Sequence, residues 1–221
     1  MRIQTFVIGY VLALALLVFA KHRTEAAPAA SFRGVVDLTN SSTPLTQHKF
    51  VKQASGTHID APAQFARGMW TVDQIPPERL IAPLVVLDVR ANVQKDPDYR
   101  VSVEDIASWE QAHGDIPLGS VVMVRTGATS GSHLPAYSED AAKFLVDGRN
   151  VLGLGIDTTS VDGRSSTKSP VHAYALAHSV YPLENVANLE RLPPTGAVIV
   201  VAPQKVKDGT SGPARLFALL H

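Results

Sequence analysis

Residues 53–65 read QASGTHIDAPAQF and place a histidine and a carboxylate, His58 and Asp60, two positions apart. If this stretch is extended, alternate side chains point to one face, which Ala54, Gly56, His58 and Asp60 would then share. Imidazole nitrogen and carboxylate oxygen suit Zn²⁺ or Mn²⁺, and a glycine leaves room for the ion. The pattern alone fits either a metal site or a hydrogen-bonded His–Asp pair without metal.

The composition limits the class of protein. The chain has 221 residues, 45% of them apolar and 18% charged, which predicts one globular domain with a sizeable core. Its formal net charge is +0 and its basic residues are scattered, so nothing indicates a nucleic-acid partner. The absence of cysteine excludes disulfides, thiolate nucleophiles and cysteine-based zinc sites.

The N-terminal segment has the layout of a secretory signal. Arg2 precedes an apolar run over residues 6–20, and several alanines follow it. We therefore expect residues 1–31 to be a signal peptide and flexible segment, and residues 32–221 to be the exported domain, periplasmic or secreted. No stable membrane partner is expected after cleavage. The alternative is an uncleaved N-terminal anchor: Lys21 and Arg23 directly after the run are unusual for a cleaved signal, although the run is short for a full span.

Strands and helices are predicted to alternate along the rest of the chain. Continuous apolar runs predict buried strands, and the segment over residues 48–58 is also expected to be extended. Serine caps and glycine stops delimit two helices, Ser102 with Gly114 and Ser138 with Gly148. The expected strands cover residues 34–39, 82–90, 119–127, 150–157, 196–203 and 214–220, and the expected helices cover residues 102–114, 138–148 and 171–180. This order predicts a single α/β domain.

Residues 55–62, SGTHIDAP, resemble the His-x-Gly-Thr-His-x-Asp-x-Pro-x-His signature of the cyclase family. That family includes bacterial kynurenine formamidases and isatin hydrolases. Further resembling blocks occur in the family's order, which makes the resemblance more specific than any single motif. These blocks are VVDLT at 35–39, TVDQIPPERLIAPLVVLDV at 71–89, GLGIDTTSVDG at 153–163, and the segment from VHAYAL at 171 to VVAP at 203.

The resemblance implies a swivelling β/β/α fold around a mixed sheet, commonly in a homodimer or higher oligomer. It also implies a divalent metal, zinc or manganese, and hydrolysis of an amide bond in a small aryl formamide or cyclic amide. His58, Asp60 and His172 match family metal ligands. Glu184 matches a carboxylate that can bridge two metals.

Two signature histidines are replaced in this chain. Ala54 stands at the position of the first one, a metal ligand, and alanine offers no donor atom. Gln64 stands at the position of the last one, which shuttles the proton in the family. A glutamine amide does not titrate near neutral pH, although it can hold a water or a carbonyl oxygen.

Two hypotheses therefore remain open. In the first, the chain is a metal-dependent hydrolase in which Glu184, or the loop histidine His133, accepts the proton. In the second, it is a non-catalytic secreted relative that binds a small molecule or a partner in the same cavity. His133 and Trp70 are expected to touch the substrate, because Trp70 follows the signature closely and loops like that of His133 lie near the cavity in the family.

Overall fold

The computed structural model describes residues 32–40, 56–128, 133–163 and 168–221. Three features expected from the sequence lie outside these residues. They are Ala54 at the position of the first signature histidine, the signal segment 1–31 and most of the extended segment 48–58. Among the described residues, no helix is long and apolar enough to cross a membrane. Residues Arg33–His221 form one compact unit.

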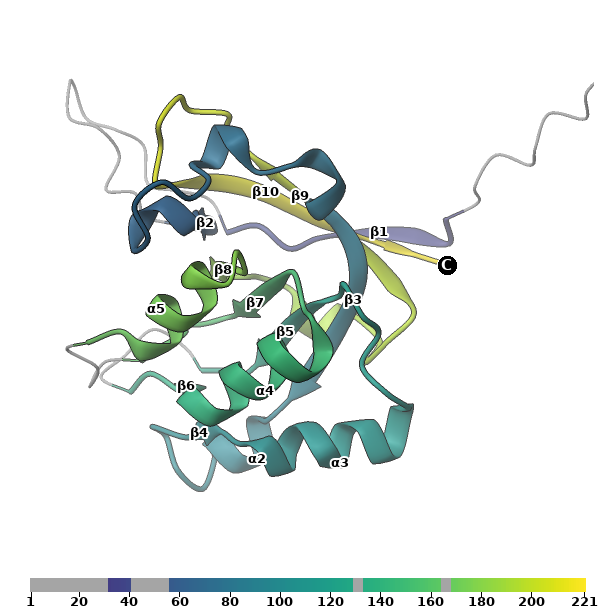
Figure 1. Cartoon of the computed structure of the whole chain (residues 1–221). Coiled ribbons are helices and arrows are strands. Elements are labelled where there is room, and N and C mark those ends of the chain that lie inside the picture. The colour runs from purple at the N-terminus through teal and green to yellow at the C-terminus, as the bar shows by residue number, and fades with distance from the viewer. Residues whose placement is uncertain (1–31, 41–55, 129–132, 164–167) are drawn as a thin grey trace, which may run out of the picture. The chain divides into compact units, whose positions relative to one another are not determined.

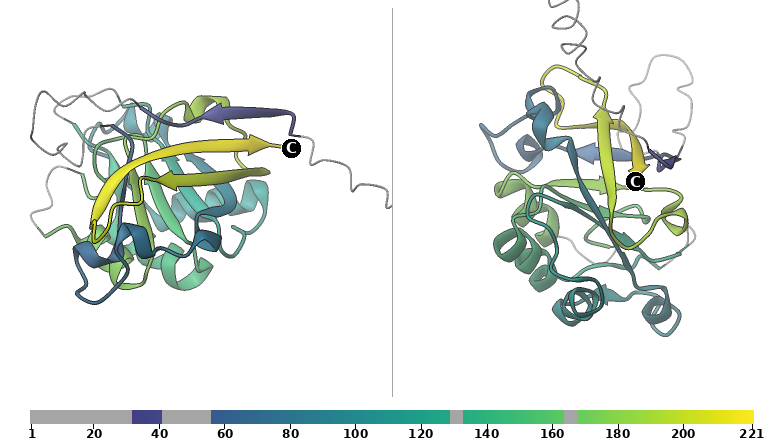
Figure 2. Two further views of the ribbon diagram at one scale, coloured as in Figure 1. Left: turned by 90° about the horizontal axis from the view of Figure 1, so that it is seen from above. Right: turned by 90° about the vertical axis from the view of Figure 1, so that its right-hand side faces the viewer.

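The described strands build one large mixed sheet and one small one. The large sheet runs in the order β1-β10-β2-β8-β7-β5-β3-β9, and β10 also pairs with β9. This extra pairing closes seven strands into a barrel-like ring, with β1 added alongside β10 (Figure 2). The strands of the large sheet are β1 (Gly34–Asp37), β2 (His58–Asp60), β3 (Ile81–Asp88), β5 (Val121–Arg125), β7 (Gly153–Ile156), β8 (Tyr181–Glu184), β9 (Ala197–Pro203) and β10 (Ser211–Leu220).

Helices cover one side of the parallel strands β3, β5 and β7, and β9 and β10 lie on the other side (Figure 1). The α-helices are α2 (Arg90–Val93), α3 (Val103–His113), α4 (Glu139–Arg149) and α5 (Pro170–Ala177). The 3-10 helices are η1 (Pro62–Gln64), η2 (Val72–Gln74), η3 (Pro77–Arg79) and η4 (Leu189–Arg191). The small sheet pairs β4 (Arg100–Val101) with β6 (Ala136–Tyr137).

Two hydrophobic cores explain the continuous apolar runs. In β3, Leu84 and Val86 pack into the core inside the ring, whereas Val85 and Leu87 pack under the helices. β5 alternates in the same way between the two cores. Both faces of these strands are buried, so their sequences lack the alternation of a half-exposed strand. The predicted α/β architecture around a mixed sheet is confirmed.

The helix ends agree with the predicted caps in all but one case. Ser102 and Ser138 accept hydrogen bonds from the backbone of their helices, and Gly114 ends α3 with φ 88°. Gly148 was expected to stop its helix, and this prediction is wrong. α4 continues through it to Arg149 and ends at Asn150, which adopts the left-handed conformation with φ 47°. Asparagine tolerates that conformation better than most residues.

The packing around two glycines predicts opposite effects of alanine. A Cβ at Gly155 would overlap the Met123 side chain inside the ring, whereas a Cβ at Gly148 on α4 would meet nothing within 4 Å. Gly155→Ala should destabilise the protein by about 1–3 kcal/mol through overpacking. Gly148→Ala should stabilise it by up to about 1 kcal/mol through helix propensity. Urea unfolding of the two variants checks this, and equal midpoints would contradict it.

Candidate metal centre

The pairing of β2 with β8 brings the two distant parts of the site together. β2 runs antiparallel to β8, with His58 opposite Glu184. On its other edge β2 pairs with β10, where Asp60 lies opposite Ser211. A two-residue separation places His58 and Asp60 on the same face of β2, as the sequence predicted. Residues 126 positions apart in the chain therefore face each other across one pair of strands.

Four side chains converge at this place. His58 Nε2 lies 3.0 Å from Glu184 Oε2. His172 Nε2 lies 3.1 Å from Asp60 Oδ2 and 3.1 Å from Glu184 Oε1. One ligand atom each from His58, Asp60 and Glu184 falls within 4.8 Å of the others. All four side chains are buried, with 3–7% of each residue exposed. The structure therefore brings together the four residues that the family resemblance matched to metal-binding positions.

Each imidazole is held through its Nδ1 atom. His58 Nδ1 lies 3.0 Å from the Gly56 carbonyl oxygen, so the ring donates its Nδ1–H there and turns Nε2 toward Glu184. Gly56 has φ 100°, a conformation that only glycine adopts readily, so the residue is required by the backbone at this turn. The sequence pattern had indicated only that Gly56 leaves space for an ion.

His172 is held by a residue that the sequence analysis missed. Its Nδ1 lies 2.5 Å from Asp162 Oδ2, in the loop before α5. Asp162 falls within the GLGIDTTSVDG block, to which we assigned no side-chain role. A signal did exist, since a metal-binding histidine usually donates its second ring N–H to a carboxylate or carbonyl. The sequence could not indicate which nearby carboxylate would take that position.

Ion pairing dominates the electrostatics of the cluster. Burial lowers the pKa of His172, but its bonds with Asp162, Asp60 and Glu184 outweigh burial and raise that pKa to about 11. Burial likewise lowers the pKa of His58, and the hydrogen bond with Glu184 raises it above its usual value. Burial raises the pKa of Glu184, but bonds with the two imidazoles hold it at about 2. The carboxylates therefore need positive charge beside them, here supplied by protonated histidines.

This donor set fits a divalent cation. Two carboxylates and two imidazole nitrogens, the latter presented through Nε2, are ligands that Zn²⁺ and Mn²⁺ accept. Buried carboxylates are stable only when paired or bound to a metal. A divalent cation among His58, Asp60 and Glu184, with His172 Nε2 beside the two carboxylates, would provide the same compensation that the protons provide.

Gln64 does not join the four converging residues. Its side chain is exposed, at the end of η1, and makes no hydrogen bond to any residue that the structure describes. Phe65 follows it with 47% of its surface exposed, and its ring stacks on His172 with centroids 5.9 Å apart. Position 64 therefore adjoins a residue that touches the cluster directly.

Trp70 and His133 stand apart from the four converging residues. Trp70 is half-buried and packs against the core inside the ring, with Arg79 5.5 Å from its ring centroid. His133 Nδ1 lies 2.8 Å from Asp98 Oδ2, in an exposed pair. His133 also lines a pocket of about 210 Å³ that includes Asn185, the residue after Glu184. This pocket adjoins the strand that carries Glu184.

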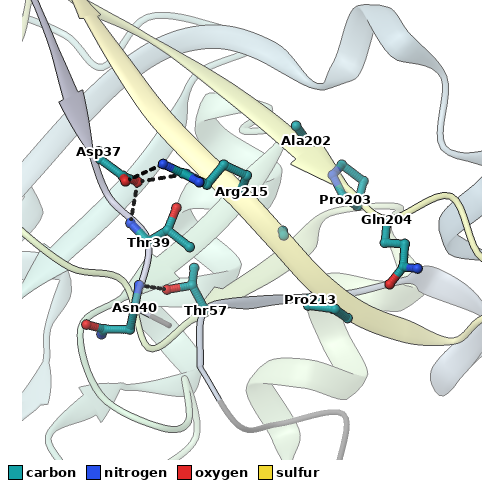
Figure 3. Close-up of a pocket in the computed structure, with 10 residues that line it drawn as sticks. Asp37, Thr39, Asn40, Thr57, Ala202, Pro203, Gln204, Pro213 and Arg215 are labelled. Carbon is teal, nitrogen blue, oxygen red and sulfur yellow. Dashed lines mark hydrogen bonds and ion pairs between the residues drawn. The ribbon is translucent and has the colours of Figure 1, made fainter. Parts of the chain in front are cut away.

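A large groove among the described residues does not include the four converging side chains. It has a volume of about 570 Å³ and lies beside β10 (Figure 3). The Asp37–Arg215 ion pair and Thr57 line it, together with polar groups that include Thr39 and Gln204. None of the four converging residues lines this groove. The volume of a groove alone would therefore not identify the four converging residues, which are the only described group of side chains suited to hydrolytic chemistry.

Sequence comparisons match this chain to hydrolases. The family model of the cyclases matches residues 15–163. An isatin hydrolase from Roseibium aggregatum is 31% identical over 188 residues, which are 75% of this chain and 71% of that protein. A kynurenine formamidase from Salinibacter ruber is 27% identical over 165 residues, which are 73% of each protein. The names of these two relatives describe a hydrolase of isatin and a formamidase.

Structural comparisons agree with this result. Isatin hydrolase A from Labrenzia aggregata, bound to benzyl benzoate, matches with a TM-score of 0.77 at 28% identity, over 85% of this chain and 93% of that chain. A protein described as a potential metal-dependent hydrolase with cyclase activity matches with a TM-score of 0.70 at 25% identity, over 85% and 98% of the two chains. The swivelling fold that the sequence predicted is confirmed.

Proposed function

Because this chain belongs to the cyclase family, we propose that it is a metal-dependent hydrolase of a carbon–nitrogen bond in a small aryl formamide or cyclic amide. The observation that carries the proposal is the buried convergence of His58, Asp60, His172 and Glu184. Burying these four ionisable side chains costs free energy, and binding a cation would offset that cost. The names of the relatives supply the substrate class.

His58, Asp60, His172 and Glu184 would hold the cation, Zn²⁺ or Mn²⁺. When bound, such an ion polarises a carbonyl oxygen and lowers the pKa of a water molecule toward neutrality. We assign proton acceptance to Glu184, whose low pKa in the metal-free cluster comes from the two imidazoles that its oxygens face. The exposed amide of Gln64 can orient a water or a carbonyl oxygen, but it cannot accept a proton near neutral pH.

Two neighbouring features support an aromatic amide as the substrate. The partly exposed ring of Phe65 presents an apolar surface beside His172, against which a flat ring can pack. His133 and Asn185 line a pocket of about 210 Å³; Asn185 directly follows Glu184, although none of the four converging residues lines this pocket. We assign His133 to substrate contact on this basis, with a second role as a proton acceptor.

Metal removal tests the proposal. The purified protein should contain about one or two equivalents of Zn or Mn by elemental analysis, as expected for a four-ligand centre with bridging carboxylates. It should hydrolyse N-formylkynurenine or isatin, lose that activity after dialysis against a chelator, and regain it when Zn²⁺ or Mn²⁺ is added back. Activity that survives complete metal removal would contradict the proposal.

The replaced position 64 favours a second candidate function. With glutamine where the family carries its proton shuttle, the chain can bind metal and an aromatic ligand without turning it over. In that case the protein is a secreted binding relative of the family. Metal uptake together with saturable binding of isatin, but with no hydrolysis at any pH, would support this alternative over the enzyme.

A further inference from the structure

Asp162 makes three hydrogen bonds at the start of α5, and it is only 3% exposed. Its Oδ1 accepts from the Val171 backbone N–H at 2.8 Å. Its Oδ2 accepts from the His172 backbone N–H at 3.1 Å and faces His172 Nδ1 at 2.5 Å. One carboxylate therefore holds both the backbone and the ring of the same residue.

These contacts fix the orientation of the His172 ring. A carboxylate accepts hydrogen bonds but does not donate them, so the hydrogen between Asp162 and His172 belongs to Nδ1. The Nε2 atom is then directed at Asp60 and Glu184, each 3.1 Å away. Phe65 stacks on the ring face and restricts its rotation further. His58 is anchored in an equivalent manner, but by the neutral carbonyl of Gly56.

We propose that Asp162 is a positioning residue, which locks the His172 ring through Nδ1 so that Nε2 faces the metal centre. This inference rests on the proposed function, because the orientation of Nε2 can affect metal binding only if a cation binds there. A purely structural role would instead confine Asp162 to capping the N-terminus of α5 through the two backbone bonds. The two roles differ in whether the ring of His172 depends on Asp162.

The first experiment measures metal affinity. Calorimetric titration of the metal-free protein with Zn²⁺, and separately with Mn²⁺, should show that Asp162→Asn weakens binding by about 10- to 100-fold, the usual cost of losing a carboxylate behind a histidine ligand. The matched control is Asp157→Asn. Asp157 is a half-buried carboxylate, which accepts hydrogen bonds from Thr126 and Gly127 instead of a cluster residue, so its variant should bind the metal within about twofold of the wild type.

The second experiment observes the ring directly in the metal-free protein. With ¹⁵N-labelled histidine, His172 should give a downfield ring N–H proton resonance, assigned by its loss in His172→Ala. This resonance should be lost or moved far upfield in Asp162→Asn and kept in Asp157→Asn. If Asp162→Asn does not fold, Asp162→Ser is used, since its hydroxyl still offers an acceptor to the helix N-terminus.

The two experiments separate the inference from the proposed function. Weakened metal binding together with the lost resonance supports positioning, even if no amide is hydrolysed. An unchanged resonance in Asp162→Asn, or metal binding within twofold of the wild type, overturns it. If the wild type binds neither metal, the proposed function fails, and the resonance alone then decides whether Asp162 positions the ring.

Discussion

Glu184→Ala is expected to abolish metal binding and to destabilise the metal-free protein by about 3 kcal/mol. Glu184 Oε1 accepts from the Val161 backbone N–H at 2.9 Å and lies 3.1 Å from His172 Nε2. Its Oε2 lies 3.0 Å from His58 Nε2. Alanine would leave a buried N–H without its acceptor and two buried imidazoles without this partner. Removing one member of a buried ion pair costs about 3–5 kcal/mol. We expect the lower end, because the imidazoles can lose their protons.

Glu184→Gln separates the charge from the hydrogen bonds. The amide oxygen can still accept from Val161, so the loss of stability should be smaller than for alanine. The affinity for Zn²⁺ should nevertheless fall by more than about 100-fold, since losing a ligand exceeds the 10- to 100-fold cost of losing a residue behind one. Urea unfolding with a chelator present measures the stability, and calorimetry measures the affinity.

The matched control for Glu184 is an exposed glutamate, Glu139. Glu139 pairs with Lys143 at 2.7 Å on α4, with 49% of its side chain exposed. Glu139→Ala should cost less than about 1 kcal/mol and leave metal binding unchanged. If Glu184→Ala unfolds at the same urea concentration as Glu139→Ala, or retains the metal, Glu184 does not hold the centre together.

Local pattern was sufficient to predict the parallel strands and the helix starts. β3 and β5 are long apolar runs because they are buried on both faces, and Ser102 is a cap within its own helical turn. β8 was missed, because YPLE is only four residues long and contains Pro182, which argues against a strand. Its existence depends on pairing with β2 and β7, which no local pattern reveals.

The residues of the site also differ in whether local sequence could predict their positions. Alternation within one short strand predicted that His58 and Asp60 share a face. His172 and Glu184 could be assigned only through the family resemblance, because Glu184 reaches β2 by strand pairing and His172 reaches it from α5, each across more than a hundred residues. Neither strand alternation nor the family resemblance indicated the role of Asp162. Its role arises from the geometry of the loop before α5, which a single sequence does not encode in a recognisable spacing.

Gln64→His is expected to raise formamide hydrolysis by about 10²–10⁴-fold, the usual contribution of a general base. Gln64 is exposed and its side chain bonds to no described residue, so the substitution should not disturb η1. The Phe65 ring, next in the chain, stacks on His172, and the family resemblance assigns position 64 to the proton shuttle. An imidazole there titrates near pH 6.5, so the gain should appear as the pH rises through that value and the ring becomes neutral.

The matched control is Arg67→His, which adds an exposed histidine three residues farther along the same turn. It should leave the rate of N-formylkynurenine hydrolysis within about twofold of the wild type, because general-base catalysis requires hydrogen-bond reach of the reacting water. Rates are measured from pH 5 to pH 9 on metal-loaded protein, with metal content determined for each sample. If Gln64→His and Arg67→His give equal rates while the wild type is active, the chain accepts the proton elsewhere. In that case Glu184, the titratable carboxylate that faces both ring nitrogens, becomes the base to test.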